Sequence, residues 1–315
     1  MQTKRTEQDL GKNYCARPYI SPTADLSDSD LYSYRQHGLL YIRGAVTPTL
    51  LVQARKIIEP WVDFQIEGWL LNGLISRDFH EFDFWHRLLE AWRSAGKPKF
   101  RRQPNRFLIN PEMFEYLHQR PFLDIAERVL GTTEISVHGI FNARPQLPGA
   151  PQTDTPFHQD SQYWGLNYDG IEPDTERQTH VLTMWIPLQE VDSTNGALHL
   201  ISKTATGDRI FTAYDYDYKN TGYLGLSPKA ISQYPHICEP MEPGDVVIFD
   251  QRTPHGAKPN NSGRIRWSVD IRYERTETAT TIGRKFGFIC QSHKDPKTET
   301  TLATWLKKRQ TSEKL

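Results

Sequence analysis

The fold is indicated most directly by the segment Pro243-Gly244-Asp245-Val246-Val247-Ile248-Phe249-Asp250, which is followed by Pro254-His255-Gly256. A Pro-Gly turn leads into a short apolar strand, and a histidine follows that strand. His158-Gln159-Asp160 lies far upstream, so that His255 comes 95 residues (255 − 160) after Asp160. Residues i and i+2 of an extended segment point to the same side, so His158 and Asp160 can converge on one metal ion. Only a fold that brings distant strands together, such as a jelly roll, can add His255 to that pair.

The pattern of the chain changes near residue 135 from helical to strand-like. Upstream, apolar spacing and helix-start signals predict helices over about 48–68, over 78–95, and from residue 110 to near Gly131 with a break at Pro121. Downstream, turn formers separate short apolar or alternating runs, which are Ile135–Ala143, Val181–Leu188, Ala197–Ile201, Val246–Phe249, Ile265–Tyr273 and Phe286–Ile289. Asn195-Gly196 between two of these runs predicts a hairpin. We predict a mainly β protein with flanking helices, a double-stranded β-helix (jelly roll, cupin-like) braced by N-terminal helices.

The whole pattern is consistent with a single domain of 315 residues. We expect a helical N-terminal part over about 1–133, a jelly-roll core over about 134–290 and a charged tail over 291–315. A tyrosine-rich insertion over 203–240 has no clear periodicity. Long excursions from a β scaffold often form lids or binding loops, so this insertion is a candidate for either role.

The composition argues against several classes of protein. The 38 Lys and Arg residues balance the 38 Asp and Glu residues, so no net charge favours nucleic acid or an anionic membrane. No apolar run approaches the roughly 20 residues that span a bilayer, and the first residues lack the apolar stretch of a signal peptide. Three scattered cysteines are too few for a disulfide framework or a zinc cluster. We expect a cytoplasmic protein with a small-molecule substrate, and we make no prediction of its oligomeric state.

The combination of His158, Asp160 and His255 predicts a particular metal. Two histidines and one carboxylate on one face of a metal, with other positions open, suit non-haem Fe(II) oxygenases. Zinc enzymes more often use three histidines, or two histidines and a glutamate, so zinc is the less favoured alternative. A histidine taken alone usually satisfies a structural hydrogen bond, and the prediction therefore rests on the arrangement of the three residues.

Arg266 is a candidate anchor for an anionic co-substrate. Turn formers over 259–263 predict that His255 and the run Ile265–Tyr273 are arms of one hairpin, which would place Arg266 within one step of His255. A guanidinium at that place can bind a carboxylate through two hydrogen bonds. The alternative is that Arg266 and Arg272, on the same face of their strand, are surface charges. The metal triad favours a functional Arg266, whereas Arg272 stays open between a substrate contact and a surface charge.

Four motifs, in order, resemble the phytanoyl-CoA dioxygenase (PhyH-like) family of 2-oxoglutarate oxygenases, over about residues 27–275. They are Tyr32–Ile42, Phe157–Ser161 with Tyr163-Trp164, Trp185–Leu188 with Asn195–Leu198, and Pro243–His255 with Pro259-Asn260. Arg266 stands eleven residues after His255, where that family places its 2-oxoglutarate arginine. Ala257 is a departure, because several relatives carry a serine there that helps to hold 2-oxoglutarate.

The resemblance implies an Fe(II)- and 2-oxoglutarate-dependent dioxygenase that uses O₂ and releases succinate and CO₂. It implies that His158, Asp160 and His255 hold the metal, and that Arg266 and Trp185 bind the co-substrate. The expected reaction is oxidation of an unactivated C–H bond of a small metabolite, by hydroxylation or by desaturation or cyclisation, as in secondary metabolism. Halogenating relatives lack the metal carboxylate, so the presence of Asp160 argues against halogenation. Candidate substrate contacts are Trp164, Arg272 and Arg102.

Two other functions remain as alternatives. A cupin-like metalloenzyme that does not use 2-oxoglutarate would give Arg266 no function, so that Arg266→Ala would leave its activity intact. A non-catalytic metal-binding module on the same scaffold would usually have lost at least one of the three ligands or the arginine.

Overall fold

The computed structural model describes residues 17–98, 107–163, 181–207, 209–211, 213–215 and 224–312. Its helices are α1 (Asp28–His37), α2 (Pro48–Leu71), α3 (Phe84–Ser94), α4 (Pro111–Leu117), α5 (Arg120–Leu130), α6 (Lys203–Thr206), α8 (Pro228–Ile231), α9 (Thr281–Phe286) and α10 (Leu302–Ser312). Short 3₁₀ turns are η1 (Pro151–Thr153), η2 (Asp160–Gln162) and η3 (Pro296–Thr298).

The predicted helices are present with shifted ends. The Thr47 side chain caps α2, which continues to Leu71. The second predicted helix begins at Phe84 rather than near residue 78, because Asp83 caps the backbone N–H groups of Trp85 and His86. The break expected at Pro121 lies just before α5, where proline is tolerated in the first helical turn.

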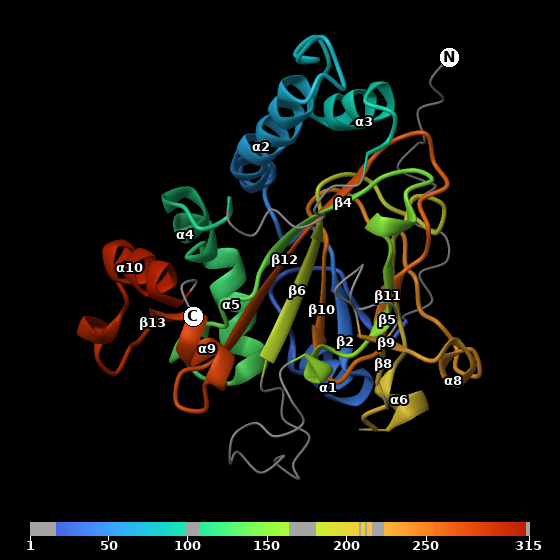
Figure 1. Cartoon of the computed structure of the whole chain (residues 1–315). Coiled ribbons are helices and arrows are strands. Elements are labelled where there is room, and N and C mark those ends of the chain that lie inside the picture. Colours follow the sequence, from blue (N-terminus) through green and yellow to red (C-terminus); the bar gives the residue numbers. More distant parts are fainter. Residues whose placement is uncertain are drawn as a thin grey trace.

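The strands form two main sheets that face each other (Figure 1). The larger sheet has the order β1-β2-β10-β6-β12-β3-β13, and β4 also pairs with β12. Its strands are β1 (Ile20–Ser21), β2 (Leu39–Ile42), β3 (Ile135–Val137), β4 (Asn142–Gln146), β6 (Val181–Pro187), β10 (Val246–Asp250), β12 (Arg266–Arg275) and β13 (Phe288–Gln291). The smaller sheet has the order β5-β11-β7, from β5 (Thr155–His158), β7 (Leu198–Leu200) and β11 (His255–Ala257). A separate pair joins β8 (Ala213–Asp215) to β9 (Leu224–Leu226).

Both predicted hairpins proved wrong, since each turn carries the chain from one sheet to the other. β11 is bonded on its two sides by β5 and β7, whereas β12 is bonded by β6, β3 and β4. Asn260 stabilises the crossing, because its side-chain N–H donates to the backbone carbonyls of Gln146 (2.9 Å) and Arg264 (2.8 Å). The Asn195-Gly196 turn likewise leads from β6 in the larger sheet to β7 in the smaller one.

The outer face of the larger sheet is covered by helices, and this contact forms the main apolar core. Figure 1 shows α4, α5 and α10 on one side of β6 and β12, with the smaller sheet on the other side. Trp267 of β12 is fully buried there, at ring-centroid distances of 6.0 Å from Trp61 of α2 and 5.2 Å from Phe84 of α3. Tyr273 of the same strand donates its hydroxyl to the Leu117 carbonyl at 2.7 Å. The helices therefore brace the sheet from outside and leave its inner face to the site.

The inner face of the larger sheet is divided into an apolar and a polar part. Buried apolar side chains from β2, β6, β7 and β10 fill one part, among them Tyr41, Trp185, Leu198, Val247 and Phe249. The other part is lined by alternate residues of β4 and β12, which are polar although they are mostly buried. Buried polar groups need hydrogen-bonding partners, and the polar residues on this face and their partners make up the candidate site.

Some predictions fall outside the described residues. Trp164, Arg102 and residues 208, 212 and 216–223 of the tyrosine-rich insertion belong to this part of the chain. Among the residues that are described, no helix combines the length and the apolar character that crossing a bilayer requires.

Candidate metal centre

His158 and His255 are brought together by strand register. His158 ends β5 and His255 begins β11, and the two residues are direct partners across this antiparallel pair. Side chains at such paired positions point to the same face of the sheet. The two imidazole rings accordingly lie with their centroids 4.2 Å apart, and both residues are less than 5% exposed.

Asp160 completes a cluster with these two rings. Its Oδ1 lies 3.8 Å from Nε2 of His158 and 4.0 Å from Nε2 of His255. One ligand atom from each of the three residues lies within 4.8 Å of the others, and among the described residues no other group of three or more His, Cys, Asp or Glu side chains does so. Asp160 opens the 3₁₀ turn η2, which directs its carboxylate back toward the strand that it has just left.

The histidine tautomers suit metal binding. Nδ1 of His158 donates to the Pro156 carbonyl at 2.8 Å, and Nδ1 of His255 donates to the Thr253 carbonyl at 2.9 Å. A donor proton on Nδ1 leaves the lone pair of Nε2 available, and Nε2 is the atom that faces Asp160. Burial lowers the pKa of both histidines, so both rings are neutral at physiological pH. The cluster therefore offers two neutral nitrogen ligands and one carboxylate.

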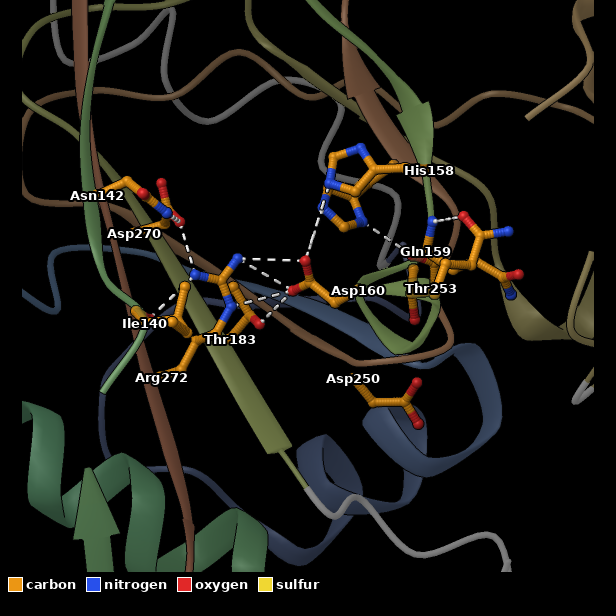
Figure 2. A network of polar contacts seen from close by, with 12 residues as sticks. Ile140, Asn142, His158, Gln159, Asp160, Thr183, Asp250, Thr253, Asp270 and Arg272 are labelled. Carbon is orange, nitrogen blue, oxygen red and sulfur yellow. Dashed lines mark hydrogen bonds and ion pairs between the residues drawn. The ribbon is translucent and has the colours of Figure 1, made fainter. Parts of the chain in front are cut away.

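Arg272 and Thr183 hold the carboxylate of Asp160 from behind, as Figure 2 shows. The Arg272 guanidinium donates from Nε to Oδ2 at 3.1 Å and from a terminal nitrogen to Oδ1 at 3.2 Å. The Thr183 hydroxyl donates to Oδ2 at 3.0 Å. Burial opposes ionisation of Asp160, but the charge of Arg272, the two neighbouring histidines and the hydrogen bonds from Arg272 together outweigh burial and hold the pKa of Asp160 well below its usual range. The carboxylate is therefore charged and oriented before any metal arrives.

Gln159, between the two candidate ligands, fixes the backbone of the motif. This fully buried side chain donates to the carbonyls of Arg209 (2.9 Å) and Arg252 (2.5 Å) and accepts from the backbone N–H of Phe211 (2.9 Å). It thereby connects the His158-Gln159-Asp160 motif to the segment that precedes His255 and to the start of the insertion.

Arg266 lies in the same cavity as the two histidines, although it reaches the cavity from the opposite sheet. The cavity is lined by Arg144, Thr155, His158, Trp185, Leu198, Phe249, His255, Ala257, Arg266, Asp270 and Arg272. The Arg266 guanidinium donates to Oγ of Ser268 at 2.7 Å and to the side-chain carbonyl of Gln146, and it sits over the Trp185 ring at 5.5 Å. Both Arg266 and Arg272 are at most 3% exposed, so the surface-charge alternative was wrong for both.

Several polar residues in and around this cavity were not predicted from the sequence. They are Asn142, Arg144, Gln146, Thr183, Ser268 and Asp270. Arg144 and Asp270 form an ion pair at 2.6 Å, and Asp270 also accepts from Arg272 at 2.8 Å. Polar residues alternate with apolar ones along both β4 and β12, and this alternation was the available signal. Such alternation usually indicates a sheet face that is exposed to water, whereas here the polar residues lie on the buried inner face of the larger sheet.

Comparisons with known proteins identify the family and agree with the fold. The family model of phytanoyl-CoA dioxygenase (PhyH) matches residues 34–268. EvdO2 from Micromonospora carbonacea var. aurantiaca, solved in complex with 2-oxoglutarate, is similar in structure, with a TM-score of 0.53, 19% identity, and coverage of 79% of this chain and 91% of that one. EctD from S. alaskensis, solved in its apoform, has a TM-score of 0.51 and 16% identity, with coverage of 83% and 84%. Both similarities concern the fold.

The jelly-roll fold and the family match define an enzyme of the 2-oxoglutarate-dependent, non-haem iron dioxygenase class. Within that class, the chain belongs to the phytanoyl-CoA dioxygenase (PhyH) family.

Proposed function

We propose that this enzyme oxidises an unactivated C–H bond of a small metabolite, with Fe(II) held by His158, Asp160 and His255. The observation that carries the proposal is the convergence of two Nε2 atoms and one carboxylate oxygen, beside a cavity that the two histidines line together with Arg266 from the opposite sheet. Three protein ligands of this kind leave positions open for a chelating co-substrate and for oxygen.

The three candidate ligands suit a ferrous ion in their charge, and they are already deprotonated and oriented before a metal binds. Metal ligands must be deprotonated to bind, and here both imidazoles are neutral and Asp160 is ionised in the metal-free protein. The backbone carbonyls behind the histidines, and Thr183 and Arg272 behind Asp160, fix the direction of each ligand. Such supporting contacts usually change metal affinity by about 10–100-fold when they are removed.

Arg266 and Trp185 are suited to bind 2-oxoglutarate. A buried guanidinium can pair with the distal carboxylate of this co-substrate through two parallel hydrogen bonds. Gln146, Ser268 and the Trp185 ring hold the guanidinium in one orientation. Ala257 lines the same cavity and offers no hydroxyl, so Arg266 would carry more of the recognition here than in relatives with a serine.

Bound iron and 2-oxoglutarate would supply the oxidising chemistry, in which O₂ is consumed and 2-oxoglutarate is converted to succinate and CO₂ while the substrate is oxidised. The protein's own part is to orient these groups and to exclude bulk water from the buried cluster. Hydroxylation is the simplest outcome, and desaturation or cyclisation would follow from a different placement of the substrate carbon.

The test is the visible charge-transfer band that forms when a 2-oxo acid chelates ferrous iron. Protein purified without oxygen is mixed with Fe(II) and 2-oxoglutarate, beside the variants Asp160→Ala and Arg266→Ala. Arg264→Ala is the matched control, because Arg264 is exposed and lies only two residues before Arg266. We expect a band in the parent and the control, no band in Asp160→Ala, and a weaker affinity for 2-oxoglutarate in Arg266→Ala.

The other outcomes separate the alternatives. Bound iron without a band would overturn the use of 2-oxoglutarate and favour a cupin-like enzyme that works without it. Failure to bind iron at all would favour a non-catalytic module or another metal.

A further inference from the structure

A buried ion pair lies next to the chain segment that carries His255, and the proposed function does not use it. Asp250, the last residue of β10, is fully buried. Its carboxylate pairs with the ammonium group of Lys203, which opens α6 and is only 8% exposed. Removing two charges from water is costly, and their attraction often does no more than offset this cost. The pair therefore suggests a role in holding a particular geometry.

Asp250 organises the turn that leads from β10 to His255. One carboxylate oxygen, Oδ2, contacts Lys203, and the other, Oδ1, accepts from the backbone N–H of Arg252 at 2.8 Å. The backbone carbonyl of Asp250 also accepts from the backbone N–H of Thr253 at 3.0 Å. Because the ion pair fixes the rotation of the carboxylate, it also fixes the path of the chain as it leaves the strand.

Thr253 connects this turn to the metal cluster, and it is drawn with Asp250 in Figure 2. Its buried hydroxyl donates to the Gly38 carbonyl at 2.7 Å, which also accepts from the backbone N–H of Asp250 at 3.1 Å. The carbonyl of Thr253 is hydrogen-bonded to Nδ1 of His255 at 2.9 Å. Contacts of this kind orient the ring of a metal-binding histidine. A displacement of Thr253 would therefore be passed to Nε2 of His255, the atom that faces Asp160.

The fold makes room for Lys203 at Gly38. The φ angle of Gly38 is +71°, and a Cβ on this residue would lie 2.7–2.8 Å from three carbon atoms of the Lys203 side chain. A larger residue would be strained there and would displace the lysine from Asp250. The backbone of Gly38 thus anchors the turn, and its missing side chain admits the ion pair.

We infer that Asp250 and Thr253 are positioning residues for His255, and that Lys203 holds Asp250 in place for this purpose. They act through the turn, by setting the direction in which Nε2 of His255 points. The inference rests on the proposed metal ligands. A purely structural role would lower stability alone, whereas a positioning role predicts altered metal binding in protein that is still folded.

Asp245 provides a matched control at the other end of the same strand. It directly precedes β10, is 5% exposed, pairs with Arg43 at 2.5 Å and accepts from the backbone N–H of Gly44 at 3.0 Å. Both aspartates thus combine a buried ion pair with a hydrogen bond to the backbone. Only the turn after Asp250 leads to His255.

The experiment uses Fe(II) and Co(II) as probes of the metal-free protein. The affinity for each ion is measured without oxygen by competition with a chelating dye, and the ligand-field absorption of bound Co(II) reports the geometry of its ligands. The variants are Asp250→Ala, Asp245→Ala, Thr253→Val and Thr253→Ser. Thr253→Val removes the hydroxyl at nearly the same volume, and Thr253→Ser keeps it. Urea denaturation records the stability of each variant separately.

We expect Asp250→Ala and Thr253→Val to weaken Fe(II) binding by about tenfold or more, since lost supporting contacts typically cost about 10–100-fold in affinity. Both variants should also change the Co(II) spectrum. Asp245→Ala and Thr253→Ser should keep the affinity and the spectrum of the parent.

Parent affinity and spectrum in Asp250→Ala or in Thr253→Val would overturn the inference, and so would an equal effect of Asp245→Ala. If Asp250→Ala does not fold, the comparison of Thr253→Val with Thr253→Ser decides, because identical metal binding in these two variants would also overturn it. A parent that binds neither ion would overturn the proposed metal ligands themselves, and the inference with them.

Discussion

Replacing Arg272 by methionine should destabilise the metal-free protein, because the buried carboxylate of Asp160 would lose its ionic partner. The guanidinium and the carboxylate are both about 97% buried and lie 3.1–3.2 Å apart. At that separation their attraction is about 5 kcal/mol for an effective dielectric constant of about 20. Removing one partner of a buried pair typically costs about 3–5 kcal/mol, since the remaining charge is left uncompensated. We therefore expect Arg272→Met to lower the free energy of unfolding by about 3–5 kcal/mol, measured by urea denaturation of chelator-treated protein.

A double-mutant cycle identifies Asp160 as the cause. Asp160→Asn removes the negative charge that Arg272→Met would leave uncompensated. In the single Asp160→Asn variant, Arg272 would keep its ion pair with Asp270. The double variant should therefore be more stable than the sum of the two single effects implies, by about 2–3 kcal/mol. Single effects that add to within about 0.5 kcal/mol would refute this reasoning, because they would show that the two side chains do not depend on one another.

Three further predictions concern other parts of the molecule. Burial raises the pKa of Glu274 from 4.5 to about 7, so its stabilising contribution is complete below pH 4.5 and is lost as the pH rises through 7. The free energy of unfolding, measured by denaturation, should therefore be about 3 kcal/mol lower at pH 8 than at pH 5, and Glu274→Gln should not show this difference. Trp267→Ala should cost about 3–5 kcal/mol in the same assay, because this side chain is fully buried between β12 and the helices. Gly196 has φ +86°, and a Cβ there would lie 2.2 Å from Oε1 of Gln146, the residue that holds Arg266; titration of the charge-transfer band should show weaker 2-oxoglutarate binding in Gly196→Ala with iron affinity retained.

The sequence was sufficient to predict the jelly-roll fold and the cluster of His158, Asp160 and His255. Those predictions drew on the spacing of His158 and Asp160, on a histidine that follows an apolar strand, and on the resemblance to a known family. The expected extended geometry was not found, because β5 ends at His158 and Asp160 begins the turn η2, which still keeps its carboxylate beside His158. The positions of the helices were also predictable, because Thr47 and Asn110 are strong helix caps followed by proline. Their ends were less so, because an unrecognised cap at Asp83 moved the start of α3.

The route by which Arg266 reaches the cavity was not predictable from local sequence. Turn formers after His255 are equally compatible with a hairpin and with a crossing between sheets, and the strand pairing that decides between them is made with residues far away in the chain. The buried ion pairs were missed for a related reason. Arg144 and Asp270 alternate with apolar residues as surface charges do, and only closure of the two sheets turns that face inward.

The cross-strand pairing of His158 with His255 links the metal centre to the order in which the chain must assemble. The two residues are separated by 97 positions (255 − 158), so closing this contact carries an entropic cost, and we expect it to form late in folding. A slip of one residue between β5 and β11 would turn one of the two imidazoles to the opposite face of the sheet. Only the correct register brings both rings to Asp160. An ion that prefers this arrangement would therefore select the properly paired strands from misaligned ones and act as a checkpoint for folding as well as a cofactor.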